Sequence, residues 1–262
     1  MMMDPPETFT ALPTVMPGVT AVLAHSARAF PRHSHDQYGI GVVDIGAQTS
    51  HSGRGPVQVQ AGDLITVNPS EVHDGLPIAA APRSWRMLYL DTGVIRTATA
   101  AQAEFCWPAL TNPQQAARLR RLFDAVTGAA DAISGLATES DLLILLHALQ
   151  DHPRPERIPA SVRAALQCLD DDPARAIPLT ELANLSGTSR FHFLRSFAAA
   201  TGLTPHAYQM QQRLHLARRL IATQTPLAEV AASAGFADQS HLTRLFRRNF
   251  GLTPKTYARA HR

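Results

Sequence analysis

The sequence has two cysteines, a single lysine and no long apolar run among its 262 residues. Cys106 and Cys168 are far apart in the chain, so no disulfide framework is expected. The most apolar run, residues 142–146, is too short to cross a bilayer, and no membrane partner is expected. The first residues carry neither a basic region nor an apolar core, so we expect no signal peptide and a cytoplasmic location. Neither a G-x-S-x-G sequence nor a P-loop occurs, which argues against hydrolases and nucleotide-binding enzymes.

The formal net charge of +3 conceals an asymmetry between the two halves of the chain. Residues 1–157 contain 11 arginines and 15 acidic residues, a net charge of −4. Residues 158–262 contain 13 basic and 6 acidic residues, a net charge of +7. This split favours a nucleic-acid-binding half joined to a half that binds something else. A basic surface without any partner is the alternative that charge alone leaves open.

Residues 179–257 contain the same pattern twice. The first copy begins L-T-E-L-A-N-L-S-G at Leu179, and the second begins L-A-E-V-A-A-S-A-G at Leu227. Each copy continues into a longer segment that ends in a related sequence, G-L-T-P-H-A-Y at Gly202 and G-L-T-P-K-T-Y at Gly251. So many matches in the same order identify an internal repeat.

Each copy is typical of a helix-turn-helix unit, about residues 179–202 and 227–251. Apolar residues fall at helical spacing on both sides of a glycine, Gly187 or Gly235, in each copy. Glycine suits this place because it adopts positive φ at little cost, as a sharp turn between helices requires. The sequence therefore predicts two helix-turn-helix units in series.

The ends of the second helix in each unit are also marked. Ser189 and Asp238 are expected N-caps, whose side-chain oxygens accept free backbone N–H groups. Gly202 and Gly251 are expected to end the same helices.

A continuous helix is expected between the two units, over residues 206–222, and a further helix before them over residues 160–169. At 1.5 Å per residue, the connecting helix can hold the two units about 34 Å apart, one turn of DNA. The two recognition helices could then enter successive major grooves on one face of a duplex.

The first half of the chain has a different organisation. Residues 1–18 are proline-rich and are expected to form a flexible arm. Short runs rich in Val, Ile, Leu and Thr follow, and they predict an antiparallel barrel or sandwich. The expected strands are Val19–Leu23, Tyr38–Ile45, Val57–Gln60, Leu64–Asn68 and Trp85–Leu90.

Two helices are expected after the strands, over residues 113–125 and 139–150, with apolar stripes that pack on the barrel and in part between subunits. Residues 151–159 contain three prolines and four charged residues, which indicates a semi-rigid linker. The expected domains are therefore residues 19–150 and 160–262.

Three histidines in the strand region are candidate ligand-binding residues. His33 and His35 are two positions apart, so on a strand they face the same side, and His73 follows a predicted strand. Three neutral imidazoles can hold a divalent transition metal. A small-molecule pocket and a structural role are the competing interpretations. A ligand is expected at the mouth of the barrel, where Tyr38, Trp85 and Tyr89 are candidate lining residues.

The histidine segments resemble the two motifs of the cupin fold, a double-stranded jelly roll. These segments are R-H-S-H-D-Q-Y-G-I from Arg32 and A-G-D-L-I-T-V-N-P-S-E-V-H ending at His73. In metal-binding cupins the ligands are an H-x-H pair, a following Glu and a later His. The histidines match, whereas neither Gly39 nor Ile40 supplies the Glu. The resemblance therefore favours small-molecule sensing without a bound cofactor or metal.

The segment G-F-A-D-Q-S-H-L-T-R-L-F-R-R-N-F-G-L-T-P-K-T-Y, Gly235 to Tyr257, resembles the AraC/XylS-type transcriptional regulators. The resemblance covers residues 160–262 and extends over residues 19–91, where the family often has a cupin-like effector-binding domain. It implies an α+β chain of two domains: a cupin-like jelly roll with a helical appendage for effector binding and dimerisation, and an all-α double helix-turn-helix domain.

The function implied is that of a sequence-specific regulator controlled by a small-molecule effector, and not of an enzyme. Its implied partners are promoter DNA, the effector, a second copy of the chain and, if it activates transcription, RNA polymerase. The alternative is a metal-sensing regulator or a cupin metalloenzyme that uses His33, His35 and His73 as ligands.

The family pattern places DNA-facing residues on the second helix of each unit. They are Arg190, Phe191, Leu194 and Arg195 in the first copy, and Gln239, Ser240, Thr243 and Arg244 in the second. Gln, Ser, Thr and Arg suit base edges, whereas Phe and Leu can only meet thymine methyls, so the second unit is better equipped for polar readout. Arg247 and Arg248 are expected to contact phosphates or to be solvated charges. Residues expected to pack instead are Phe193, Phe197, Leu242 and Phe246.

Overall fold

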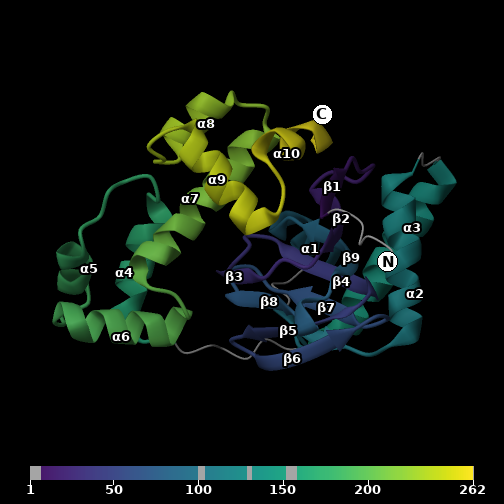
Figure 1. The fold of residues 1–262 in the computed structure, drawn as a ribbon, viewed down its shortest axis with the longest axis horizontal. Coiled ribbons are helices and arrows are strands. Elements are labelled where there is room, and N and C mark those ends of the chain that lie inside the picture. Colours follow the sequence, from purple (N-terminus) through teal and green to yellow (C-terminus); the bar gives the residue numbers. More distant parts are fainter. Residues whose placement is uncertain (1–6, 100–103, 129–131, 152–157, 262) are drawn as a thin grey trace. The chain divides into compact units, whose positions relative to one another are not determined.

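The computed structural model describes residues 7–99, 104–128, 132–151 and 158–261 (Figure 1). Contacts divide the chain into two units, Met1–Pro153 and Arg154–His261. The division falls inside the linker predicted at residues 151–159, most of which lies outside the described residues. No helix among the described residues is long and apolar enough to span a membrane.

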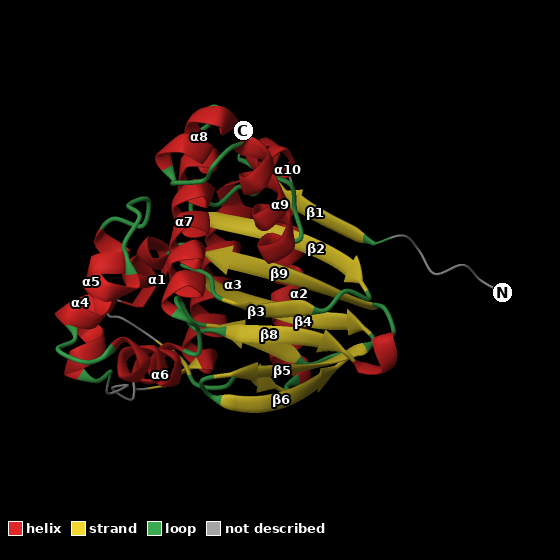
Figure 2. Cartoon of the chain, turned by 60° about the vertical axis from the view of Figure 1, so that its left-hand side comes forward, coloured by secondary structure: helices red, strands yellow, loops and turns green. Residues whose placement is uncertain are grey.

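The N-terminal unit is built on two antiparallel sheets (Figure 2). The first has the strand order β1 (Thr8–Leu12), β2 (Val19–Ser26), β9 (Arg83–Leu90), β4 (Tyr38–Ile45), β7 (Leu64–Val67) and β11 (Ala109–Leu110). The second has the order β3 (Phe30–His33), β8 (His73–Pro77), β5 (Ala47–Ser52) and β6 (Gly55–Gln60). A small ladder pairs β10 (Glu104–Phe105) with β12 (Gln150–Asp151), and a 3₁₀ turn spans Ile78–Ala80.

The two sheets face each other and are not joined into one closed barrel. Phe30 of β3 meets Trp85 of β9 edge to face, with ring centroids 6.2 Å apart, so aromatic side chains fill the space between the sheets. The predicted sandwich, with two sheets as in a jelly roll, is therefore confirmed, and the closed barrel is not formed.

Helices cover the outer face of the six-stranded sheet. Strand alternation places Ile40 and Leu88 on this face, where they are buried with Leu119 of α2 (Pro113–Thr127) and Leu145 of α3 (Ala132–Leu149). Figure 1 shows α2 and α3 side by side. The predicted helical pair is confirmed, although α3 begins earlier than expected. A further helix, α1 (Thr92–Thr99), was not predicted.

Residues 8–12 form β1, which corrects the prediction of a flexible arm over residues 1–18. The proline-rich composition does not extend into this stretch, T-F-T-A-L, which is made mainly of strand-forming residues. β1 pairs with β2 along its whole length, and Phe9 packs against Phe30 and Trp85. Residues 1–6 lie outside the described residues.

The C-terminal unit is helical. Its helices are α4 (Ala160–Asp171), α5 (Leu179–Leu185), α6 (Arg190–Thr201), α7 (Pro205–Ala222), α8 (Leu227–Ser233), α9 (Gln239–Phe250) and α10 (Pro254–Ala260). The pairs α5–α6 and α8–α9 are the two predicted helix-turn-helix units, and α7 is the predicted continuous helix between them. α4 packs on α5, α6 and α7.

The predicted helix ends are confirmed residue by residue. Ser189 accepts a hydrogen bond from the His192 N–H at 3.3 Å, and Asp238 accepts one from the His241 N–H at 2.7 Å. Gly202 and Gly251 end α6 and α9 in the left-handed conformation, with φ of 73° and 74°. The repeat is thus a repeat of capping chemistry as well as of sequence.

In each repeat an aromatic pair packs the second helix of the unit against the helix that follows it. Phe197 meets Tyr208 edge to face at 5.6 Å, and Phe246 meets Tyr257 in the same way at 5.7 Å. The Tyr208 hydroxyl donates to Asp170 of α4 at 2.9 Å, whereas the Tyr257 hydroxyl accepts from Arg218 of α7 at 3.0 Å. The same packing position therefore anchors each unit to a different helix.

Candidate functional site

The recognition helices α6 and α9 separate core residues from exposed ones as predicted. Phe193, Phe197, Leu242 and Phe246 are buried. The predicted DNA-facing residues lie on the other side. Leu194 and Thr243 are partly exposed, and the exposed residues are Arg190, Phe191, Arg195, Gln239, Ser240, Arg244, Arg247 and Arg248. All ten are accessible to a partner, and their contact with DNA stays a prediction.

Phe191 is the most exposed large apolar side chain among the described residues, at 70% exposure. The Arg195 guanidinium carbon lies 5.2 Å from the centre of its ring, one helical turn away on α6. This cation–π contact holds the arginine beside the aromatic face. The first unit therefore offers a combined apolar and cationic surface, while the second offers mainly polar side chains.

Arg213 of α7 connects the loop before the first helix-turn-helix unit to the turn of the second. Its guanidinium donates to the carbonyl oxygens of Pro173 and Ala174, at 2.8 and 3.1 Å, in the loop before the first unit. It also donates to the carbonyl of Gly235, at 2.6 Å, in the turn of the second unit. No sequence motif marks Arg213, so this role could not be predicted from the sequence.

Gly235 allows the turn of the second unit to pack closely against the loop at Ala174. Its φ is +76°, and a Cβ added there would lie 2.7 Å from the Ala174 carbonyl oxygen and 2.9 Å from the Ala174 Cα. The equivalent Gly187 has φ of +63° and open space around it. Both turns need positive φ, but only the second is packed against another segment.

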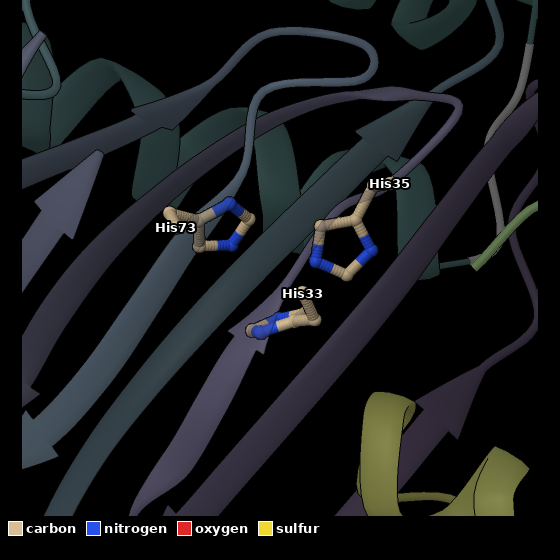
Figure 3. A group of neighbouring side chains, drawn as sticks. All are labelled: His33, His35 and His73. Carbon is tan, nitrogen blue, oxygen red and sulfur yellow. The ribbon is translucent and has the colours of Figure 1, made fainter. Parts of the chain in front are cut away.

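Three histidines meet in the N-terminal unit (Figure 3). His33 of β3 is the register partner of His73 of β8, and His35 lies two residues beyond the end of β3. The ring centroids are 4.4 Å apart for His33 and His73, 5.0 Å for His33 and His35, and 5.2 Å for His35 and His73. One ring nitrogen of each lies within 4.8 Å of the others. The structure thus brings together the three histidines chosen from the sequence.

Backbone carbonyls fix two of the imidazole rings. His33 Nδ1 lies 2.8 Å from the carbonyl oxygen of Pro31, and His73 Nδ1 lies 3.0 Å from that of Glu71. A carbonyl only accepts, so Nδ1 carries the proton and, in the neutral ring, Nε2 carries the lone pair. Burial lowers the pKa of His73 to about 4, so this imidazole is neutral at pH 7.

The predicted aromatic lining residues fall on two faces of the sheet. Tyr89 stands beside His35, with ring centroids 5.0 Å apart, and Trp85 faces the same space between the sheets. Tyr38 lies on the opposite face, packed against Phe105 at 5.4 Å in the core beneath the helices. Strand alternation explains the separation, and Tyr38 is not brought together with the histidines.

The structure shows where the Glu ligand of metal-binding cupins, which this chain lacks, would lie. Ile40 is buried in the core beneath the helices, so position 39 is the one that faces the space between the sheets. A Cβ on Gly39 would lie 2.6 Å from Met87 Cε and 3.5 Å from Tyr89 Cε1. Met87 therefore fills the space that a carboxylate side chain would occupy.

Arg83 is a buried residue that is not among the candidates predicted from the sequence. It is 1% exposed, and its guanidinium lies 4.9 Å from the Trp85 ring centre. It donates to Gln48 Oε1 at 2.6 Å and to the carbonyl oxygens of Ser26 and Arg28 at 3.2 and 3.0 Å. Burial lowers its pKa to about 10, which leaves it cationic at pH 7. The strand predicted from the sequence begins at Trp85, so Arg83, at the start of β9, fell outside it.

The comparisons with known proteins match both units. The AraC-like ligand binding domain matches residues 17–146, and the helix-turn-helix domain matches residues 182–260. The HTH-type transcriptional regulator YbfI of Bacillus subtilis is 28% identical over 229 residues, 81% of each chain. The HTH-type transcriptional activator RhaS of Escherichia fergusonii is 26% identical over 241 residues, 87% of each chain.

A solved structure shares the fold. Unsaturated fatty acid bound ToxT from Vibrio cholerae aligns with a TM-score of 0.58 at 12% identity, over 93% of this chain and 95% of that one. The two domain matches together span most of the sequence, and the relatives that follow it through both units are transcriptional regulators. The chain therefore belongs to the AraC/XylS family of transcriptional regulators.

Proposed function

We propose that this protein binds one promoter sequence through α6 and α9 together, and that a small molecule held between the sheets of the N-terminal unit controls this binding. The observation that carries the proposal is the pair of capped helix-turn-helix units joined by the single helix α7. A ligand controls such an equilibrium only if it binds one arrangement of the chain more tightly than another. The chain needs no catalytic step for this role.

The space between the sheets supports an effector with an apolar body. Phe9, Phe30 and Trp85 contribute aromatic rings there, and Tyr89 stands beside the histidine cluster. ToxT, which shares the fold, is known with an unsaturated fatty acid bound. We therefore place the effector beside Trp85, Tyr89 and the three histidines.

We propose further that two copies of the chain associate, and that they contact RNA polymerase if the protein activates transcription. Leu143 and Ile144 of α3 are 45% and 48% exposed on a helix whose other face is buried in the core. A second copy could cover these side chains.

Gel-shift titration on DNA from upstream of the protein's own gene tests the DNA-binding role. We expect one duplex to retain binding in excess random DNA at 0.15 M salt, because base contacts add to the phosphate contacts that salt weakens. The control is a duplex of the same length and composition in shuffled order. Equal competition by the shuffled duplex, over the whole upstream region, would contradict sequence-specific binding.

Replacing Arg244 by alanine tests direct readout by the second unit. We expect specific binding to weaken by about 1–3 kcal/mol, roughly 5-fold to 150-fold, if the guanidinium pairs with a base edge. Binding to random DNA should change much less. Arg247→Ala, on the same helix, is the matched control and should weaken binding to both DNAs equally through a lost phosphate contact. Equal losses on both DNAs for Arg244→Ala would show that Arg244 does not read sequence.

A further inference from the structure

The histidine cluster offers ligand atoms that the proposed function does not require. His33 and His35 are only 6% and 5% exposed, and one nitrogen of each lies within 4.8 Å of one nitrogen of His73. Three imidazole nitrogens gathered within 4.8 Å of one another are a donor set that suits a transition metal.

The same local geometry orients two of the three rings. In both His33 and His73 the Nδ1–H donates to the carbonyl two residues earlier in the chain, Pro31 or Glu71. This leaves Nε2 as the coordinating nitrogen in each. A backbone carbonyl on the far nitrogen is the usual outer partner of a metal-bound histidine, since it sets the tautomer and the direction of the ring.

No carboxylate among the described residues joins the three histidines as a potential metal ligand. The group of potential ligands among the described residues consists of the three histidines alone. Glu71 is engaged elsewhere, because both of its carboxylate oxygens accept from Arg54, at 2.8 and 2.7 Å. Arg54 also donates to the Phe105 carbonyl at 2.6 Å, so the ion pair holds the loop before His73 in place. A divalent ion bound by these imidazoles would keep its full charge.

We propose that His33, His35 and His73 bind a divalent transition metal of the zinc, cobalt or nickel class and leave one coordination position open to an anionic ligand. Tetrahedral sites with imidazole bonds of about 2.1 Å place the nitrogens about 3.4 Å apart, so nitrogens that lie within 4.8 Å of one another need to approach by at most about 1.4 Å. Pairing of β3 with β8 keeps the backbones of His33 and His73 side by side during this adjustment. The open position follows from three donors on a metal that prefers four. The site does not depend on the regulatory role, since metal binding is measured without DNA.

Cobalt binding to the full-length chain tests the site. The purified protein is treated with a chelator, dialysed and titrated with Co²⁺ while its visible spectrum is recorded. We expect one Co²⁺ per chain, with the intense absorption of tetrahedral cobalt, and displacement by one equivalent of Zn²⁺. Added azide should shift these bands by occupying the open position. A spectrum of octahedral cobalt alone, or no saturation at one equivalent, would overturn the proposal, and bands that azide leaves unchanged would overturn the open position.

Glutamine variants assign the ligands. His33→Gln and His73→Gln should each weaken Zn²⁺ binding at least about 100-fold, because each loses one of three donors. His51→Gln is the control, since His51 is exposed on β5 and lies outside the cluster. Tryptophan fluorescence checks folding, and His35→Gln, which lies beyond the strand, replaces any variant that fails it. Unchanged affinity in the cluster variants, or an equal loss in His51→Gln, would contradict the assignment.

Discussion

Gly235→Ala is expected to destabilise the C-terminal unit and to weaken promoter binding. An alanine at φ of +76° costs about 1–2 kcal/mol in the left-handed region. Its Cβ would also stand 2.7 Å from the carbonyl oxygen of Ala174, a backbone atom that cannot move away alone. Forcing the two segments apart adds about 1–3 kcal/mol and strains the hydrogen bonds from Arg213 to both of them. We expect a total loss of about 2–5 kcal/mol in urea unfolding followed by helical circular dichroism.

Gly187→Ala provides the matched control from the other repeat. Gly187 has nearly the same backbone conformation, with φ of +63°, but nothing lies within 4 Å of its added Cβ. This variant should therefore be destabilised only by the conformational cost of alanine at positive φ, about 1–2 kcal/mol. Equal destabilisation by the two substitutions would show that the contact with Ala174 contributes nothing. The difference between them measures how tightly the second turn is held.

The repeat could be predicted in detail because its determinants are local. The cap at Ser189 or Asp238 accepts from an N–H three residues later, and the glycine that ends each helix needs only its own backbone conformation. These rules act within one turn of helix, so the sequence displays them directly. The histidine cluster was found from the two-residue spacing of His33 and His35, although His35 lies beyond the end of β3, so strand alternation alone does not account for its place.

Contacts between distant segments could not be predicted in the same way. Arg213 and Arg83 each bind carbonyl oxygens from segments far away in the chain, and a carbonyl carries no sequence signal. The sequence of β4 predicts a strand that includes Tyr38 but does not say which face of the sheet the helices cover. Phe105 and the helices cover the face that carries Tyr38, so this side chain lies away from the histidines.

Arg83→Met is expected to be among the most destabilising single changes in the N-terminal unit. Methionine has a similar length and keeps the contact with Trp85, but it donates no hydrogen bond. The carbonyl oxygens of Ser26 and Arg28 and the Gln48 side chain would then lose their partner at a position that is 1% exposed. Each unsatisfied buried group costs about 1–3 kcal/mol, and partial relaxation brings the total to about 3–5 kcal/mol.

Tryptophan fluorescence can measure this loss in one unit alone, because both tryptophans, Trp85 and Trp107, belong to the N-terminal unit. Arg96→Met is the control, since Arg96 is exposed on α1 and its replacement should stay within about 0.5 kcal/mol. Arg83→Lys separates charge from geometry: it keeps the cation but lacks the planar fork that reaches several carbonyls at once. If the lysine variant is as stable as the natural chain, the positive charge alone suffices. If it is nearly as unstable as the methionine variant, the hydrogen bonds to both sheets hold the ligand-binding unit together.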